Sequence, residues 1–505
     1  MDPACLRHTE LPHTSRLFSD FLYQYHRVER FFTAPPSTGY PEDRRPAMVA
    51  ALRAQNGDHP ALETLSRPGA VTVVTGQQVG LFSGPAYTIF KALTAAKLAE
   101  QLSSSGTPAV PVFWLATEDH DFAEVNHAWF FDGGTQPVRV EVDAHPEANL
   151  PVGSIPAKCW PIDQLAAAIG DFPFADDVLD LVRRTYQPGA TLGTAFHGLL
   201  REILRPFGFL FIDPLHPTTR ALAAPMMRRA VLIGSDLNKL LLERNRELEA
   251  AGYHSQVHVE ASTSLFFILE GGKRLPLRDL KYSREELADR AEQLSPNALL
   301  RPVVQDYMLP TAAYVGGPAE IAYFAQSQVL YDKLLGHMPR LVSRSGFTLF
   351  DARSAKLMDR YQLKPRDFFH GEEALRERIA SRLLPSELDR EFSSVTAATD
   401  ELIGRLQGAV AKFDPTLGSS IDKSRSKVLF QLGKARAKVA REVLRREDRA
   451  RQEAEHLYNT VYPHKHLQER LYSILPFLAR HGLELVERLY DNVRLDCPDH
   501  ILLRL

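Results

Sequence analysis

The stretch from Val71 to Lys91 restricts the possible folds of this chain more than any other segment. It begins with an apolar run typical of a buried strand, continues through a turn rich in glycine and glutamine, and reaches Pro85. Proline is favoured in the first turn of a helix, where its missing N–H has no intrahelical partner, and either Ser83 or Gly84 could cap that helix. This order predicts an α/β unit whose helix N-terminus attracts an anion.

The segments that follow alternate between short apolar runs and helical periodicity. Residues 110–117 are apolar on both faces of a strand, which is typical of parallel strands covered by helices. We therefore predict a doubly wound, mainly parallel α/β core. The predicted strands are 71–75, 110–117, 207–213, 256–260, 264–269, 302–305, 312–315, 341–343 and 347–350. The predicted helices are 85–102, 192–205, 218–230, 235–251, 318–336 and 353–361.

Two segments interrupt this alternation of strand and helix patterns. Residues 128–190 carry several prolines and include an alternating run at 137–145, which is typical of a half-exposed strand. Residues 253–300 form a second interruption. Because 505 residues exceed one ordinary core, we predict several structural units, the first being a core over 1–370 with these two insertions.

The pattern changes to long helices near residue 372. Apolar residues recur at three- and four-residue spacing over 388–413 and again over 421–439, with a Pro/Gly break between them. We predict an antiparallel coiled-coil hairpin over 371–460, with its second helix ending near 460. Because a lone hairpin buries little surface, we expect a second copy of the chain to complete a homodimer. Residues 461–505 are predicted to form one or two helices and a final strand that return to the core.

Composition argues against several kinds of partner. Apolar residues make up 44% of the chain, which suits a folded protein, and the formal net charge is −2, without the basic excess of a nucleic-acid binder. A basic run at 434–451 could indicate RNA binding, but acidic residues interleave with it, which favours a solvated coiled-coil face. No apolar run is long enough to cross a bilayer. We expect neither nucleic-acid nor membrane partners.

The cysteines indicate the compartment. Cys5, Cys159 and Cys497 lie far apart and form no C-x-x-C pair, which excludes a zinc knuckle or a dithiol motif. Few and scattered thiols fit a reducing environment, and the first residues lack the apolar core of a signal peptide. We therefore expect a cytoplasmic protein.

An acidic cluster follows the second predicted strand. Glu118, Asp119, His120 and Asp121 stand where a doubly wound sheet binds its ligands. Carboxylates packed this densely are costly unless they handle protons or face a cation. They could act as a general base, hold an ammonium group or bind Mg²⁺. The alternative is a solvated loop in which an aspartate caps the next helix. We predict a catalytic role for these four residues and no zinc site, since no thiol is near.

The first glycine turn supplies candidate binding residues. Its amides could hydrogen-bond a polar ligand, its glycines allow close backbone approach, and Tyr87 and Lys91 share one helix face. Lys91 could contact a phosphate or carboxylate, although alone it would be interpreted as a surface lysine. The turn matches neither the G-x-G-x-x-G nor the P-loop pattern. Its candidates are Gln77, Gln78, Ser83, Gly84, Tyr87 and Lys91.

A second turn of the same kind follows the strand predicted at 312–315. It leads through two glycines to Pro318 at a helix start, so that two helix N-termini would share one sheet edge. The alternative is a tight turn whose acidic residue serves the helix dipole. If the prediction holds, Gln78 and Asp119 meet at one rim of one sheet. Ser343–Ser345, after a later strand, could hold a phosphate or form a surface turn. Candidates of the second turn are Gln305, Tyr314, Gly316, Gly317 and Glu320.

Three motifs together closely resemble the cysteine ligase family of bacillithiol biosynthesis. They are TGQQVGLFSGPAYTIFK (75–91), VPVFWLATEDHDFAEVNH (110–127) and RPVVQDYMLPTAAYVGGPAEIAY (301–323). The likeness covers nearly the whole chain, including the coiled coil. It implies a Rossmann-like core with two connecting-peptide insertions, a coiled-coil domain that dimerises, and substrate contacts that include Asn126 of the second motif.

The resemblance also implies a reaction, in which cysteine is joined through its carboxyl group to the amine of glucosaminyl-malate. The related class I aminoacyl-tRNA synthetases carry H-x-G-H at the first helix, whereas Thr88–Lys91 here contains no histidine. Because a free carboxylate needs activation, we expect a nucleotide (ATP or ADP), with Mg²⁺ possible and the helix starts at 84–87 and 317–320 as phosphate donors. The alternative function is a non-catalytic dimeric protein that binds a nucleotide or small molecule on a degenerate synthetase-like fold.

Overall fold

The computed structural model describes residues 4–32, 39–277 and 282–505, and it divides into two units. The first unit runs to Thr348 and includes Glu469–Leu503, and the second comprises Leu349–Gln468 with the last two residues. The sequence prediction had placed boundaries at 370 and 460. Residues 278–281 of the second predicted insertion lie outside the described residues. None of the described helices combines the length and the apolar character needed to cross a bilayer.

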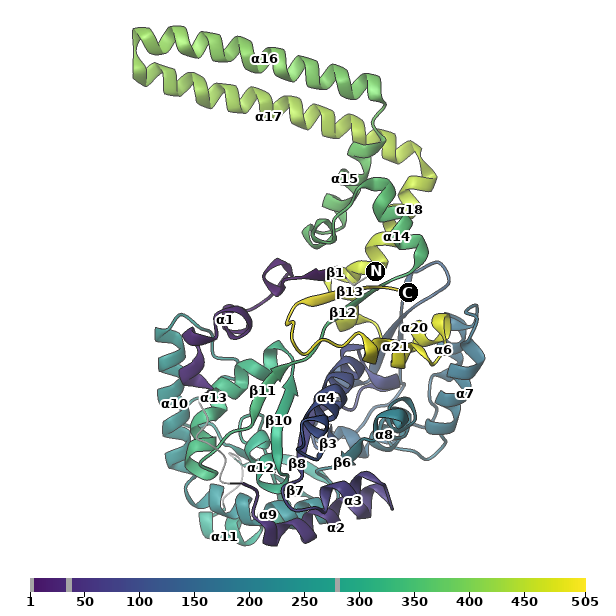
Figure 1. The fold of residues 1–505 in the computed structure, drawn as a ribbon, viewed down its shortest axis with the longest axis vertical. Coiled ribbons are helices and arrows are strands. Elements are labelled where there is room, and N and C mark those ends of the chain that lie inside the picture. Colours follow the sequence, from purple (N-terminus) through teal and green to yellow (C-terminus); the bar gives the residue numbers. More distant parts are fainter. Residues whose placement is uncertain (1–3, 33–38, 278–281) are drawn as a thin grey trace. The chain divides into compact units, whose positions relative to one another are not determined.

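A five-stranded sheet with the order β11-β10-β2-β3-β6 forms the centre of the first unit (Figure 1). Every neighbouring pair is parallel, which confirms the predicted doubly wound core. β2 and β3 pair along their whole length, from Val71 opposite Ala109 to Gln78 opposite Ala116. Their carboxyl ends therefore lie at the same edge. The strands are β2 (Val71–Gln78), β3 (Ala109–Ala116), β6 (Leu210–Ile212), β10 (Thr311–Gly316) and β11 (Arg340–Ser343).

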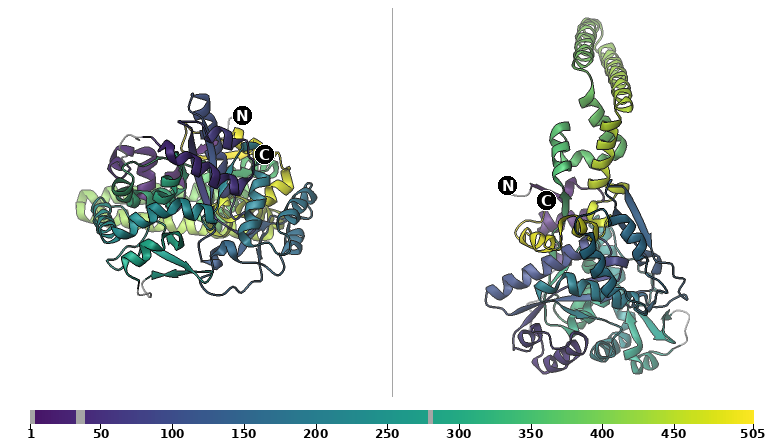
Figure 2. Two further views of the ribbon diagram at one scale, coloured as in Figure 1. Left: turned by 90° about the horizontal axis from the view of Figure 1, so that it is seen from below. Right: turned by 90° about the vertical axis from the view of Figure 1, so that its right-hand side faces the viewer.

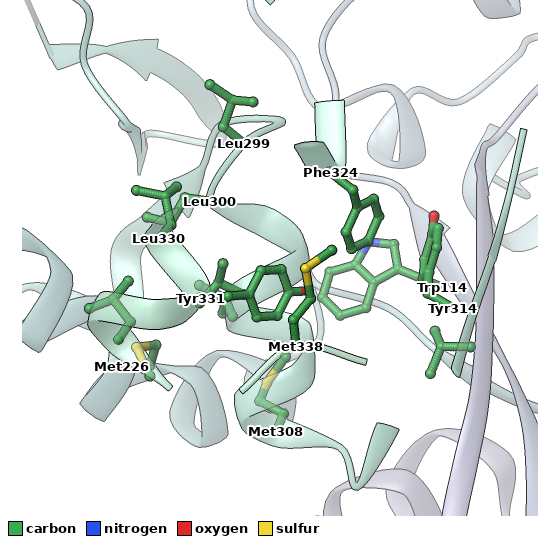
Figure 3. Close-up of a cluster of buried hydrophobic side chains, with 14 of the residues drawn as sticks. Trp114, Met226, Leu299, Leu300, Met308, Tyr314, Phe324, Leu330, Tyr331 and Met338 are labelled. Carbon is green, nitrogen blue, oxygen red and sulfur yellow. The ribbon is translucent and has the colours of Figure 1, made fainter. Parts of the chain in front are cut away.

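Both faces of this sheet are apolar, as predicted, because alternate residues of each strand point to opposite sides. On one face Phe113 packs against Phe196 of α8 (Leu192–Ile203), and α4 (Tyr87–Ser104) lies along β2 and β3. On the other face Trp114 and Tyr314 join a buried cluster with α9 (Pro217–Leu232), α12 (Arg301–Met308) and α13 (Pro318–Leu334). Figure 3 shows Trp114 and Tyr314 beside Phe324 of α13.

The two predicted insertions carry antiparallel sheets of their own. The first contains the hairpin of β4 (His127–Phe131) and β5 (Pro137–Glu141), followed by α6 (Ile162–Ile169) and α7 (Ala175–Thr185). The second contains the sheet β8-β7-β9, built from β7 (Phe266–Glu270), β8 (Lys273–Pro276) and β9 (Leu294–Pro296), with α11 (Arg284–Asp289).

Other elements of the first unit complete its outer layers. β1 pairs with β13 in antiparallel fashion, and α2 packs against β6. β12 (Phe347–Phe350) contains the point at which the chain passes into the second unit. The elements are β1 (Ala4–Leu6), α1 (Arg16–Tyr23), α2 (Arg45–Asn56), α3 (Ala61–Leu65), α5 (Phe122–Val125), α10 (Gly234–Ala250), α19 (Gln468–Leu471), α20 (Leu475–His481), α21 (Leu485–Asp491) and β13 (His500–Arg504).

The second unit contains the predicted helical hairpin. α16 (Ser386–Phe413) and α17 (Pro415–Arg446) run side by side in Figures 1 and 2 and are joined by ion pairs such as Arg425 to Asp400 at 2.6 Å. The turn contains Asp414, whose side chain caps α17 by accepting from the Thr416 N–H. The remaining helices are α14 (Ala352–Tyr361), α15 (Glu372–Leu383) and α18 (Asp448–Val461).

Two predicted strands are wrong. Residues 302–305 lie in helix α12, where Pro302 occupies the first turn and Arg301 donates to Gln305 one turn later at 3.0 Å. A short apolar run does not distinguish a strand from a buried helix, and Pro302 favours the helix start. Residues 256–260 form no strand, since Val257 exchanges its backbone hydrogen bonds with the Gln326 side chain at 2.9 and 2.8 Å instead of a neighbouring strand.

Two predicted helix boundaries and one predicted number of helices also differ. α4 begins at Tyr87 rather than at Pro85, and the Ser83 side chain does not cap it. The charged helix predicted to end near 460 is divided at Glu447: α17 packs against α16 and α15, and α18 packs against α15 and α14. After residue 465 the chain forms three short helices instead of one or two.

Candidate functional site

A cleft of about 560 Å³ opens at the carboxyl ends of β2, β3 and β10, within the first unit. Its size falls in the range of about 300–1,000 Å³ common for small-molecule sites. The topology explains its place, because ligands of doubly wound sheets bind beyond the carboxyl ends of the strands. Predicted site residues that line the cleft are Gln77, Gln78, Tyr87, Glu118, Asp119, His120, Tyr314, Gly317 and Glu320.

The two principal motifs meet in this cleft, as predicted. Gln78, at the end of β2, donates a hydrogen bond to Asp119 Oδ2 at 2.7 Å and a second to Glu124 at 2.8 Å. Asp119 Oδ1 accepts the backbone N–H of His120 at 2.8 Å. Gly76 permits this close approach of β2 to β3, because a Cβ at that position would lie 2.8 Å from the Trp114 Cβ. The side chain of Asp119 is thus held in one orientation at the rim of the sheet.

An arginine from the second insertion determines how His120 can act. Arg274 of β8 lies 3.1 Å from His120 Nδ1 through Nη1 and 3.7 Å from Asp119 Oδ1. Its other donors bind Ser295 Oγ and the Pro296 carbonyl at 2.9 and 3.0 Å. A guanidinium only donates, so His120 must accept at Nδ1 and carry its hydrogen on Nε2. His120 is therefore arranged as a neutral hydrogen-bond donor.

Lys91 fixes the geometry of the cleft from beneath it. Its buried ammonium group donates to the Gly76 carbonyl at 2.7 Å and to Gln77 Oε1 at 3.0 Å, and it contacts Glu320 Oε2 at 2.7 Å. These three acceptors use all three hydrogens of the ammonium group. Lys91 does not line the cleft. Its contacts connect the end of β2 to the start of α13.

Glu320 is the acceptor at the centre of this arrangement. Besides Lys91 it receives the Gly317 N–H and the Tyr314 hydroxyl, both at 2.7 Å. Burial alone would raise the pKa of Glu320, but Lys91 and these hydrogen bonds outweigh it and lower that pKa. Burial lowers the pKa of Lys91, and Glu320 opposes that shift. Glu320 therefore stays ionised and closes the first turn of α13, which agrees with the alternative that an acidic residue serves this helix start.

At both helix starts predicted to bind phosphate, backbone N–H groups already donate hydrogen bonds to acceptors within the protein. The Ala86 N–H, before α4, donates to the Tyr472 carbonyl at 2.7 Å. The Gly317 N–H, before α13, goes to Glu320, and the next residue, Pro318, has no N–H. Neither start offers the full set of donors expected from its sequence.

Several predicted residues do not line the cleft. Ser83 and Gly84 are buried, and the Ser83 hydroxyl lies 3.2 Å from that of Ser473. Gly84 has φ +62° and Ser83 φ +74°, so these residues shape the turn. The others outside the cleft are Lys91, Asp121, which is exposed, Asn126, which donates to Glu141 at 2.8 Å, and the buried Gln305 and Gly316.

The remaining acids of the cleft face arginines. Buried Glu118 pairs with Arg220 of α9 at 3.4 Å. Arg344 lines the cleft and binds Glu469 through both guanidinium nitrogens, and this partner lowers the pKa of Glu469 to about 2 against the opposing effect of burial. Among the described residues, no three His, Cys, Asp or Glu side chains gather closely enough to hold a metal ion.

Sequence reasoning missed most of the cationic residues of the cleft. Arg274 lies in an insertion, Arg301 directly before a segment interpreted as a strand, and Arg470 in the C-terminal return. Trp114 and Tyr323 also line the cleft; Trp114 was interpreted only as part of an apolar strand, and Tyr323 was not proposed as a site residue. The available signals were the second motif, which contains Trp114, and the third motif, which begins at Arg301 and ends at Tyr323.

Comparisons with known proteins cover both units. The family model for the N-terminal Rossmann-like domain of bacillithiol biosynthesis BshC matches residues 4–345, and the model for the C-terminal coiled-coil domain of BshC matches 347–505. A relative from Solibacter usitatus, named "Putative cysteine ligase BshC", is 52% identical over 99% of both chains. Relatives of the same name from Koribacter versatilis and Symbiobacterium thermophilum are 37% identical over 100% of both chains and 32% identical over 95% of this chain and 94% of the relative.

Proposed function

Because the chain belongs to the BshC family of bacillithiol biosynthesis, we propose that it is a ligase that joins the carboxyl group of cysteine to the amine of glucosaminyl-malate. The observation that carries this proposal is the match to both family domains, together with 52% identity over 99% of the chain to a relative bearing the ligase name. We assign the reaction to the cleft at the carboxyl ends of the sheet strands, because the conspicuous motifs meet there.

We assign Asp119 as the base of the reaction. The amine of the sugar is protonated in water and must lose that proton before it attacks. Asp119 lies at the rim of the cleft, is partly exposed, and is oriented by Gln78 and by the His120 N–H. In the proposed step one proton of the ammonium group passes to Asp119 and the nitrogen bonds to the carbonyl carbon of the activated cysteine. The bond to the leaving group then breaks, and the nitrogen gives its second proton to solvent.

His120 complements this base in the proposed step. The carbonyl oxygen gains negative charge when the amine adds, and a donor aimed at that oxygen stabilises the addition. With Nδ1 facing Arg274, His120 presents Nε2–H as such a donor. Gln78 and Arg274 are positioning residues, since they hold the side chains of Asp119 and His120.

A free carboxylate needs activation before it forms an amide, and we propose that a nucleotide such as ATP supplies it, with Mg²⁺ bound to its phosphates. The predicted phosphate-binding positions fit this group poorly, because the N–H groups at 86 and 317 donate within the protein. The acids at 118 and 119 already face arginines and do not form a metal site by themselves. We therefore derive no step through the nucleotide.

The test uses the purified full chain with cysteine, glucosaminyl-malate and ATP. We expect a product whose mass equals the two substrates less one water, with ³¹P NMR identifying the cleaved phosphate bond. Asp119→Asn should reduce kcat by about 100-fold or more, since general base catalysis contributes about 10²–10⁴. Asp121→Asn is the matched control, because Asp121 is exposed and lies outside the cleft. Absence of product, or equal rates for the two variants, would contradict the proposal.

We also propose that the second unit forms the interface of a homodimer. Its hairpin leaves large apolar side chains exposed on α16 and α17, including Leu402 at 61% and Phe430 at 60%. A second hairpin of the same sequence would cover them. The cytoplasmic location stays a prediction.

A further inference from the structure

Four acids in or beside the cleft have a basic partner within the first unit. Each of these carboxylates lies within 4 Å of an arginine or lysine nitrogen, so each pair contributes no net charge. The pairs are Glu118–Arg220, Asp119–Arg274, Glu320–Lys91 and Glu469–Arg344. The net charge of the cleft therefore depends on the arginines that have no carboxylate partner.

Two further arginines line the cleft without a carboxylate partner among the described residues. Arg301 donates to the Tyr323 hydroxyl at 2.7 Å and to Gln305 Oε1 at 3.0 Å, and both acceptors are neutral. Arg470 makes no hydrogen bond or ion pair with the part of the chain that the structure describes, and its guanidinium carbon lies 5.8 Å from the centre of the Tyr87 ring. The cleft therefore carries about two uncompensated positive charges.

Asp306 does not balance Arg301. It accepts hydrogen bonds from the Tyr331 hydroxyl and from Gln305, and it is not within ion-pair distance of Arg301. Burial raises the pKa of Asp306, which disfavours its charged form. The positive charge of Arg301 is therefore available to a ligand.

Trp114 provides independent evidence that this part of the cleft binds a ligand with a hydrogen-bond acceptor. Its side chain is 2% exposed and lines the cleft, and its indole Nε1–H has no hydrogen-bond partner among the described residues. The guanidinium carbon of Arg301 lies 5.8 Å from the centre of the Trp114 ring. A buried donor without an acceptor is costly, so an oxygen that accepts from it is stabilising.

We propose that Arg301 and Arg470, with the Trp114 N–H, form a subsite for the dicarboxylate end of the substrate. A guanidinium fork matches a carboxylate, and two unpaired arginines match two carboxylates. The inference rests on the proposed function, since the malyl group of glucosaminyl-malate carries such a pair. It orients the substrate, with the malyl group toward the two arginines and the amine toward Asp119.

The same arginines could in principle bind phosphate, but the surroundings favour carboxylates. Phosphate sites in doubly wound folds rely on backbone N–H groups at helix starts. Here the N–H groups at 86 and 317 are already engaged, and the ionised Glu320 stands at the start of α13. A polyphosphate would therefore find few free backbone N–H donors at these helix starts.

The test is isothermal titration of the full chain with glucosaminyl-malate, methyl glucosaminide and pyrophosphate. Arg470 is exposed and makes no hydrogen bond or ion pair with the described residues, so Arg470→Gln is the principal variant. Arg488→Gln is its matched control, since Arg488 is exposed on α21 and lies outside the cleft. We expect Arg470→Gln to weaken glucosaminyl-malate by tenfold or more, Arg470→Lys by less, and Arg488→Gln not at all.

The other titrations and the activity assay distinguish carboxylate binding from phosphate binding. They also test the subsite separately from the ligase function. Unchanged binding of methyl glucosaminide to Arg470→Gln supports the subsite, because that sugar lacks the malyl group. Loss of pyrophosphate binding with unchanged glucosaminyl-malate binding would overturn the carboxylate assignment. Product formation by Arg470→Gln with an unchanged KM for glucosaminyl-malate would overturn the subsite and leave the ligase function standing. Arginine-dependent binding without amide formation would overturn the function and leave the subsite standing.

Discussion

The pair of Lys91, which is buried, and Glu320, whose side chain is 18% exposed, provides the most direct test of how the cleft is held in shape. We consider Lys91→Met, Glu320→Gln and the double variant. Methionine keeps the aliphatic length of lysine, and glutamine keeps the size and one acceptor oxygen of glutamate, so each change removes a charge with little change in volume.

The expected size of the effect follows from the contacts. At a separation of 2.7 Å and an effective dielectric constant of about 20, the attraction is about 6 kcal/mol, and desolvation of two buried ions offsets part of it. Removal of one member of a buried pair typically costs about 3–5 kcal/mol. In Lys91→Met the carboxylate keeps its bonds from Gly317 and Tyr314, so we expect the lower end, about 3 kcal/mol.

The double variant should cost less than the sum of the two single variants, because neither charge is then left buried alone. We expect a coupling energy of about 2 kcal/mol or more. The surface pair Lys97–Glu100, on the same helix α4 at 3.2 Å, is the matched control. The same cycle with Lys97→Met and Glu100→Gln should give a coupling below about 1 kcal/mol.

Urea unfolding followed by tryptophan fluorescence is the appropriate assay. The chain has three tryptophans, Trp114, Trp129 and Trp160, and all three lie in the first unit. The signal therefore reports that unit separately, which avoids assuming one two-state transition for both units. Additive costs in the Lys91/Glu320 cycle would refute the argument that this pair acts as one structural element.

Three further predictions follow from other contacts. At neutral pH, ¹⁵N NMR should find His120 with its hydrogen on Nε2, and Arg274→Met should remove this preference; an unchanged tautomer would contradict the role of Arg274. Burial lowers the pKa of His8 to about 3, so the stability contributed by its neutral form is complete above about pH 6.5 and is lost as pH falls toward 3. Between pH 6.5 and 5, the unfolding free energy of His8→Phe should therefore fall less steeply than that of the unchanged chain, by about 1.4 kcal/mol per pH unit. Equal pH slopes for the two chains would refute this. Light scattering should find a dimer that Leu402→Glu converts to a monomer, and a dimeric variant would exclude the hairpin as the interface.

The fold was largely predictable because it depends on patterns that are local in sequence. Residues 110–117 are apolar on both faces, and this alone indicates a covered parallel strand, which the structure confirms as β3. The failures were also local. The apolar run at 302–305 fits a strand or a buried helix equally well, and the hydrogen bonds of Val257 to a side chain leave no trace in the sequence.

The location of the cleft was predictable, but many of its contacts were not. The neighbouring parallel strands β2 and β3 end at one edge of the sheet, so the meeting of Gln78 with Asp119 follows from topology. Arg274 and Arg470 reach the same cleft from an insertion and from the C-terminal return. Their contribution depends on long-range packing, which no local pattern records.

The location of the cleft and its ligand contacts depend on different residues, and this has a physical cause. The conspicuous residues of the motifs, such as Lys91, Gly317 and Glu320, satisfy one another and thereby fix the strand ends and the start of α13. A group whose hydrogen bonds are all used inside the protein has little left for a ligand. Ligand recognition then falls to groups with unused capacity, and in this cleft those include Arg301, Arg470 and the N–H of Trp114. The groups that satisfy one another therefore build the cleft, and Arg301 and Arg470 give it its charge.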